Sequence, residues 1–111
     1  MTVSELCTAE EFELITPPQD RETKISVPYC CDLLSWAMGR APEGCAWVTV
    51  IANQNTLAVA QLTEAACIIL AENVRPDEKM KEKALEQGIC IMTSPLPAFE
   101  TALKVYEAIN V

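Results

Sequence analysis

Short hydrophobic runs alternate with amphipathic stretches along the second half of this chain. The runs at 66–70 and 89–92 contain no strongly polar residue, which is typical of strands covered on both faces of a sheet. The stretches that follow them, 76–87 and 97–109, place hydrophobic residues three and four positions apart, the spacing of a helix with one buried face. Two successive strand–helix units predict parallel strands joined by right-handed crossovers.

Residues that start and stop helices mark the ends of both amphipathic stretches. Pro76 fits the first turn of a helix, where no N–H is needed, and Gly88 fits a left-handed cap at its end. Pro97 starts the second helix. We predict that this second helix buries a face formed by Phe99, Ala102, Leu103, Tyr106 and Ile109.

The first half of the chain has a less regular pattern. It predicts a short N-terminal helix opened by a capping box at Thr2, and a helix at 33–40 that Asp32 caps. A third helix is expected to begin with Asn55 or Thr56 as its cap. Strands are predicted at 12–15, 24–29 and 45–51.

These elements together predict an α/β fold, a single-domain layered sandwich with a mostly parallel sheet that spans residues 1–111. Pro28 has no backbone N–H to donate, so the strand that contains it is expected at an edge of the sheet. A chain of 111 residues is long enough to bury an ordinary core, and its 50% hydrophobic content argues against disorder.

The helix predicted at 33–40 is hydrophobic around most of its circumference. A helix of this kind is either central in its own domain or shared with another subunit. We therefore predict a homodimer whose interface includes Leu33, Trp36 and Ala37. The alternative is that the N-terminal segment 3–6 folds over this helix and covers it within one chain.

The charge of the chain excludes two classes of partner. With 16 acidic and 8 basic residues its net charge is −8, whereas nucleic acids and anionic membranes both require clustered Lys or Arg. No hydrophobic run approaches the ~20 residues that span a bilayer, and the N-terminus lacks a basic, apolar leader. We expect a cytoplasmic protein with neither a nucleic-acid nor a membrane partner.

Six cysteines and no histidine restrict the possible chemistry. Without histidine there is no Ser–His–Asp triad, no Cys–His pair and no histidine metal ligand, and the sequence has no C-x-x-C motif. We expect no metal and no cofactor. The adjacent pair Cys30 and Cys31 is the one candidate nucleophile or redox pair, but the neighbouring carboxylate of Asp32 weakens a thiolate. The chain is therefore predicted to be non-catalytic.

Polar residues cluster where each predicted parallel strand gives way to a helix. The carboxyl ends of parallel strands meet at one edge of the sheet, where open α/β sheets usually hold ligands. The predicted ligand-binding residues at this edge are Asn53, Asn55, Glu72, Asn73, Thr93 and Ser94. The alternative is that these side chains only cap helices and close turns, as Asn, Ser and Thr often do.

Several short segments spread along nearly the whole chain carry a family resemblance. They are residues 32–34, 43–44, 55–60, 68–70, 75–77, 84–89 and 93–101. Their order and spacing resemble the DRTGG domain family, which includes regulatory domains of some phosphate acetyltransferases and pyrophosphatases. The resemblance implies one DRTGG-like domain with a fold similar to the N-terminal domain of HPr kinase/phosphorylase. It is closest to small stand-alone members from anaerobic bacteria.

Two positions depart from the pattern of that family. The Thr-Gly-Gly of the family falls on Ala71, Glu72 and Asn73, and its Asp-Arg falls near Asn53 and Gln54. A glycine-rich turn lets backbone amides approach a phosphate closely, whereas the carboxylate of Glu72 repels one. We therefore expect adenine nucleotides to bind weakly or not at all.

Three functions follow from these observations. The first is a non-catalytic regulatory or ligand-sensing module, a homodimer that acts on or with a metabolic or redox enzyme. Some members that this chain resembles occur beside hydrogenase or electron-transfer genes, which implies as a second function an accessory subunit of an anaerobic redox complex. The third is a thiol-based enzyme or redox sensor that uses Cys30 or Cys31.

Overall fold

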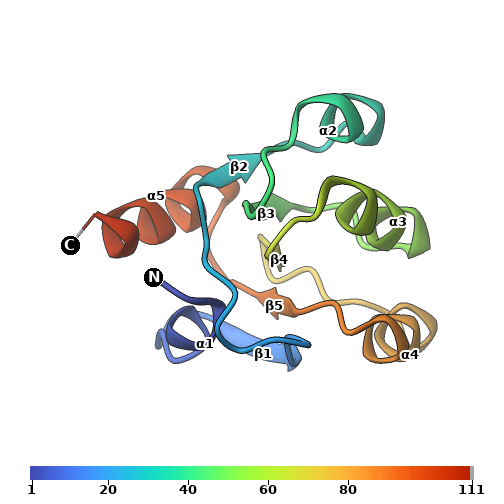
Figure 1. The fold of residues 1–111 in the computed structure, drawn as a ribbon, viewed down its shortest axis with the longest axis horizontal. Helices are drawn as coiled ribbons and strands as arrows, with labels where there is room; N and C mark the ends of the chain where they lie inside the picture. The colour runs from blue at the N-terminus through green and yellow to red at the C-terminus, as the bar shows by residue number, and fades with distance from the viewer. Residues whose placement is uncertain (111) are drawn as a thin grey trace.

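The strands form one sheet in the order β1-β5-β4-β3-β2 (Figure 1). In this computed structural model, which describes residues 1–110, the strands are β1 (Glu13–Thr16), β2 (Pro28–Cys30), β3 (Ala46–Thr49), β4 (Cys67–Leu70) and β5 (Ile91–Thr93). Strands β2 to β5 run parallel, and β1 pairs antiparallel with β5. The mostly parallel sheet is confirmed, and β2 with its Pro28 does lie at an edge.

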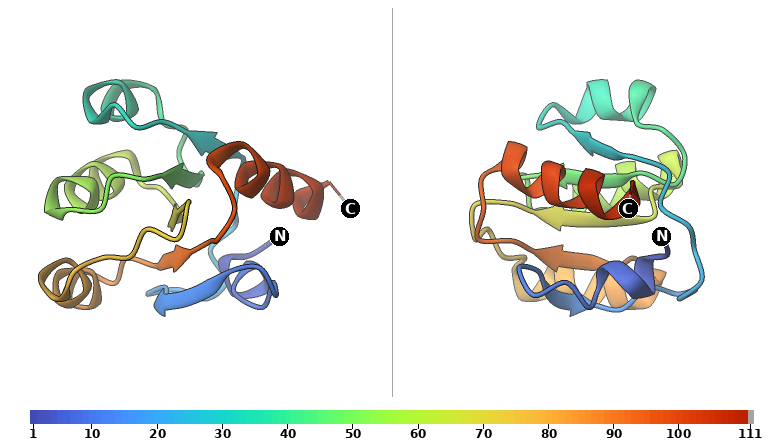
Figure 2. Two further views of the ribbon diagram at one scale, coloured as in Figure 1. Left: turned by 180° about the vertical axis from the view of Figure 1, so that it is seen from behind. Right: turned by 90° about the vertical axis from the view of Figure 1, so that its left-hand side faces the viewer.

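Helices cover both faces of this sheet (Figures 1 and 2). One face packs against α2 (Leu34–Arg40), α3 (Gln54–Thr63) and α4 (Glu78–Gln87), and the other against α1 (Val3–Leu6) and α5 (Ala98–Ile109). Alternate residues of each buried strand therefore enter different cores. Val48 and Ile69 face α1 and α5, whereas Trp47 and Ile68 face the other three helices. The predicted α/β sandwich is confirmed.

Several predicted helix ends differ from those in the structure. Gly88 is the left-handed cap of α4, as expected, with a φ of 70°. Pro76 is not in the first turn, because the Asp77 side chain accepts a hydrogen bond from the Met80 amide and starts the helix there. Similarly Asn53, rather than Asn55 or Thr56, caps α3.

Asp32 does not cap α2, because its side chain bonds to residues at the end of β3 instead. Its Oδ1 accepts hydrogen bonds from the Thr49 hydroxyl at 2.8 Å and the Val50 amide at 2.9 Å, both at the end of β3. The helix begins one residue later than predicted, with Leu33 at the capping position. Asp32 thus ties the loop after β2 to the loop after β3.

The strand predicted at 24–29 is only partly in the sheet. Its last two residues open β2, while Ile25 donates its amide to the Met1 carbonyl at 3.0 Å and Lys24 bridges to Thr2. The first part of the predicted strand therefore pairs with the N-terminus. This pairing anchors α1 beside the sheet.

The buried face of α5 is only partly the predicted one, since Ala102 and Ile109 pack against the core but the larger predicted residues do not. Thr101 and Val105 are fully buried, whereas Phe99, Leu103 and Tyr106 point away from the core. The helix lies across β2 and β3, and its small residues allow close packing there. The hydroxyl of Thr101 is satisfied by the Leu96 carbonyl at 3.1 Å, so its burial leaves no unpaired polar group.

The outer side of α2 is also exposed. Leu33, Trp36 and Met38 each keep about half of their surface in contact with solvent, whereas Ala37 is fully buried against α3 and the sheet. Ala37 therefore cannot form an interface between chains, and Leu33 and Trp36 remain on the surface. The N-terminal helix α1 lies on the opposite face of the sheet and does not cover α2 (Figure 1).

Within residues 1–110, no helix is both long and apolar enough to cross a membrane.

Candidate functional site

The loops that follow β3, β4 and β5 all leave the sheet at the carboxyl ends of the parallel strands, as predicted. We call this side of the sheet its carboxyl edge. These strands are parallel neighbours, and backbone hydrogen bonds join their loops. The amide of Ala71 donates to the carbonyl of Thr49 at 3.0 Å, and the amide of Ser94 donates to the carbonyl of Leu70 at 2.8 Å. The carboxyl edge of the sheet therefore brings the three predicted loops together.

The segment from Ser94 to Pro97 crosses this edge on its way from β5 to α5. The Glu72 amide donates to the Leu96 carbonyl at 2.9 Å, and the Asn73 amide donates to the Ser94 carbonyl, also at 2.9 Å. The chain then reaches the outer strand β2, where the sulfur of Cys30 lies 3.8 Å from the Ala98 carbonyl. The backbone amides of Glu72 and Asn73 are thus occupied by carbonyl groups of the same chain and are not free to bind an anion.

Glu72 and Asn73 both adopt the left-handed conformation that favours glycine. Each has a φ of 60°, and both side chains are exposed. The tight turn that glycine would allow is therefore present without glycine. Asn tolerates this conformation better than other non-glycine residues, so most of the strain falls on Glu72.

We predict that Glu72→Gly stabilises the protein by roughly 0.5–1 kcal/mol. A left-handed non-glycine residue costs about 1–2 kcal/mol, and glycine removes this cost. The greater flexibility of glycine in the unfolded chain offsets part of the gain. Urea denaturation would measure the change. The matched control is Glu82→Gly in the exposed middle of α4, which should destabilise the protein by about 1 kcal/mol. A destabilising Glu72→Gly would mean that the carboxylate contributes more than its backbone strain costs.

Half of the predicted ligand-binding side chains have structural roles. Thr93 and Ser94 are buried, with the Thr93 hydroxyl donating to the Val74 carbonyl at 2.7 Å. The Ser94 hydroxyl contacts the hydroxyl of Thr101 at 2.9 Å and accepts from the Leu96 amide. Asn53 caps α3 by accepting from two amides. These residues hold the loops in place, as the alternative interpretation expected.

The other three predicted residues are at the surface. Asn55 lies in the exposed first turn of α3, and Glu72 and Asn73 project from the loop after β4. Asn53 is exposed as well, although its oxygen caps α3, so the edge offers three carboxamides and one carboxylate for contact with a ligand. Sequence reasoning did not identify the role of Asp32, although an acidic residue directly after a strand is a signal of the same kind.

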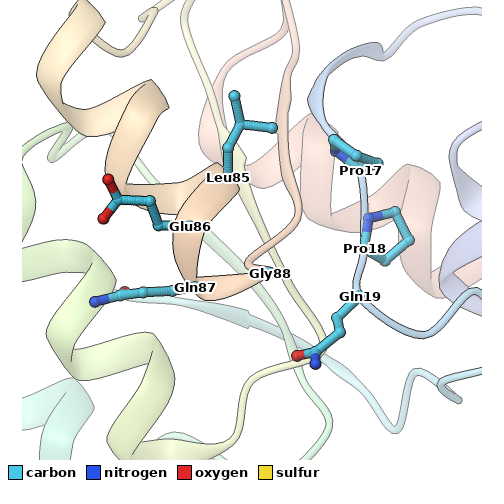
Figure 3. A pocket seen from close by; sticks show the side chains of 7 residues that line it. All are labelled: Pro17, Pro18, Gln19, Leu85, Glu86, Gln87 and Gly88. Atoms are coloured by element: carbon cyan, nitrogen blue, oxygen red, sulfur yellow. The ribbon is translucent and has the colours of Figure 1, made fainter.

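Two hollows lie away from these residues, around β1, α1 and the end of α4. One has a volume of about 300 Å³ and is formed by the end of α4 and the segment after β1 (Figure 3). It is lined by Pro17, Pro18, Gln19, Leu85, Glu86, Gln87 and Gly88. The second, of about 240 Å³, shares the two prolines and is lined also by Ser4, Cys7, Thr8, Leu14 and Arg21. Neither hollow includes a predicted ligand-binding residue.

Two of the cysteines illustrate how this fold makes its thiols less reactive. Partial burial, the carboxylate of Asp32 and the adjacent Cys31 all raise the pKa of the exposed Cys30 thiol, which lowers its thiolate fraction at neutral pH. Burial also raises the pKa of Cys45, to about 11. Among residues 1–110, no group of three or more Cys, Asp or Glu side chains is arranged to hold a metal ion. The geometry therefore gives no support to thiol catalysis.

Comparison with known proteins identifies a related fold. No family model matches the sequence, and no curated protein matches it. A crystal structure of the CBS and DRTGG domains of the regulatory region of a Clostridium perfringens pyrophosphatase, in complex with its activator diadenosine tetraphosphate, superposes with a TM-score of 0.74 at 14% sequence identity. The superposition covers 93% of the present chain and 44% of the pyrophosphatase chain, so this chain spans less than half of that one. The two chains thus share a fold over almost the full length of this protein.

Proposed function

We propose that this protein is a non-catalytic regulatory or ligand-sensing module, which works as a homodimer and acts on or with a metabolic or redox enzyme. The observation that carries this proposal is that polar groups at the carboxyl edge are hydrogen-bonded within the chain. The amides of Glu72 and Asn73 and the hydroxyl of Thr93 donate to carbonyl groups of the chain, the hydroxyls of Ser94 and Thr101 bond to each other, and the exposed side chains include Asn55, Glu72 and Asn73. Amides and a carboxylate can recognise a ligand, but they do not form a nucleophile with a general base.

The chemistry of this edge also favours one class of ligand. The amides of Glu72 and Asn73 already bond to carbonyl groups, and the side chain of Glu72 carries a negative charge. A phosphate would meet few free donors and a repelling carboxylate. A small molecule with an amino or amide group would find acceptors in all three side chains. The related pyrophosphatase region binds diadenosine tetraphosphate, and we propose that the present site differs from it in this respect.

A thermal-shift screen against nucleotides, amino acids and polyamines tests both parts of the proposal. A ligand present at 100 times its dissociation constant adds about 2.7 kcal/mol of stability, or roughly 10 °C in Tm for a domain of this size. We expect an amino-bearing compound to raise Tm, and Glu72→Gln to remove most of the shift. Diadenosine tetraphosphate and ATP at 1 mM should change Tm by less than about 2 °C.

Three outcomes of the screen would contradict the proposal. If ATP or diadenosine tetraphosphate raises Tm by about 10 °C at 1 mM, the carboxyl edge accepts phosphate and the ligand class proposed above is wrong. If Glu72→Gln and the exposed control Glu82→Gln reduce an amine-dependent shift equally, the ligand binds elsewhere. If no compound shifts Tm, the protein does not sense a small molecule of these classes.

A further inference from the structure

The outward face of α5 presents a continuous stripe of large hydrophobic side chains. Phe99, Leu103 and Tyr106 have exposed fractions of 70%, 41% and 54%. Their spacing of four and three residues places them on one side of the helix, opposite the buried Thr101 and Val105. We refer to Phe99, Leu103 and Tyr106 as the α5 stripe.

The α5 stripe reverses the usual arrangement of an amphipathic helix, in which the largest apolar residues face the core. With side-chain areas of ~150–250 Å² for the aromatic residues, the exposed fractions leave roughly 300 Å² of apolar surface on this helix. The largest apolar patch on a typical monomer is about 300–600 Å² and often has a function, so the stripe is a candidate binding surface. Neither hollow of the protein lies beside it.

Acidic residues border one side of the stripe. Glu100 and Glu107 are exposed there, one turn before and one turn after Leu103. The lysine between them, Lys104, pairs with Glu11 at 3.5 Å, so its charge is partly neutralised. The border is therefore net negative, on a chain whose net charge is −8.

We propose that the α5 stripe is the docking surface for one amphipathic helix of a partner protein, with apolar residues at i, i+3 or i+4 and i+7 and with Lys or Arg along one flank. The apolar side chains would pack between Phe99, Leu103 and Tyr106, and the basic flank would face Glu100 and Glu107. This proposal rests on the proposed regulatory function, because it names the surface through which the module contacts the enzyme that it regulates.

Area and charge both favour a single helix over a second copy of the chain. A stable dimer buries about 800 Å² on each partner, of which roughly 500 Å² is apolar in a homodimer, more than the apolar area of the stripe. A two-fold contact through α5 would also bring the acidic borders of two chains together, and like charges at an interface oppose association. A basic helix matches the stripe in size and neutralises its border.

Fluorescence anisotropy with a labelled 18-residue peptide tests the proposal. The probe carries Leu at i, i+3 and i+7 and Lys along one flank, and its control peptide has Glu in place of each Lys. We expect the basic peptide to bind at low salt, with a tenfold weaker affinity for Leu103→Ser and a severalfold weaker affinity for Glu100→Gln with Glu107→Gln. Leu62→Ser, at a 70% exposed leucine of α3, is the matched control and should leave binding unchanged. Circular dichroism confirms that each variant is folded.

Four outcomes would overturn the proposal. They are equal affinity for the acidic and basic peptides, no binding at millimolar peptide, equal loss for Leu103→Ser and Leu62→Ser, and a dimer in light scattering that Leu103→Ser dissociates. Stripe-dependent binding to vesicles of phosphatidylcholine and phosphatidylglycerol, without peptide binding, would assign the surface to a membrane instead. Failure here leaves the metabolite-dependent Tm shift intact, whereas failure of the sensing function removes that shift and leaves peptide binding.

Discussion

Trp47→Ala is expected to destabilise the protein by about 3–5 kcal/mol, a large part of the ~5–15 kcal/mol by which a typical domain is folded. Trp47 lies in β3, the strand next to the edge strand, and it is fully buried in the core beneath α2, α3 and α4. Its indole N–H donates to the carbonyl of Cys31 at 2.9 Å, which also fixes the loop before α2. Truncation removes both the packing and this hydrogen bond.

Urea denaturation followed by circular dichroism measures this loss. The chain offers a matched control in Trp36, its other tryptophan, which is half exposed on α2. Trp36→Ala should cost less than about 1 kcal/mol when measured on the monomer, because an exposed side chain loses little packing. Trp47→Phe retains most of the volume and isolates the hydrogen bond, at about 1–2 kcal/mol. Similar losses for Trp36→Ala and Trp47→Ala would show that β3 is not the centre of the core.

The parts of the fold that the sequence predicted well are those where local and tertiary preferences agree. The runs at 66–70 and 89–92 are apolar on both faces because helices cover both faces of the sheet, so a local pattern reports a tertiary arrangement. Gly88 ends α4 in the left-handed conformation, which glycine adopts at little cost. Strand–helix alternation then restricts the connections to parallel crossovers.

The predicted face of α5 was wrong at Phe99, Leu103 and Tyr106 because the pattern considers size and hydrophobicity but not what the helix packs on. Residue spacing identified a stripe that includes Phe99 and Tyr106 as the buried side. In the structure the helix packs on the sheet through smaller residues. Hydrogen bonds to Ser94 and Leu96 offset the cost of burying the Thr101 hydroxyl. A polar residue with partners inside the chain is invisible to a hydrophobic pattern.

The convergence of the three loops was predicted from the sequence, but the contacts of their side chains were not. Parallel strands require their following loops to share an edge, so the convergence of those loops follows from the fold class. The path of the segment 94–97 across this edge is a tertiary feature, and it determines which groups are occupied. It buries the hydroxyl of Ser94 in hydrogen bonds and occupies the backbone amides of Glu72 and Asn73, whose side chains stay exposed. Sequence spacing carries no information on that path.

Trp36→Glu is expected to convert a homodimer into a monomer. Leu33 and Trp36 lie three residues apart and present exposed apolar side chains at the start of α2, and the Arg40 guanidinium lies 4.1 Å from the Trp36 ring centre. Near this surface the charges of Asp32 and Arg40 balance, so two copies can approach without the repulsion that an acidic border would cause. Aromatic residues at the centre of an interface often contribute 2 kcal/mol or more.

A two-fold interface doubles the effect of this substitution, because each chain contributes the same residue to it. A loss of about 4 kcal/mol corresponds to roughly a thousandfold weaker association. Light scattering at micromolar concentration should therefore report twice the chain mass of 12.2 kDa for the wild type and the single mass for Trp36→Glu. Leu62→Glu, at a leucine of α3 that is 70% exposed against 53% for Trp36, is the control and should remain dimeric. A monomeric wild type, or a folded Trp36→Glu variant that stays dimeric, would show that α2 is not the dimer interface.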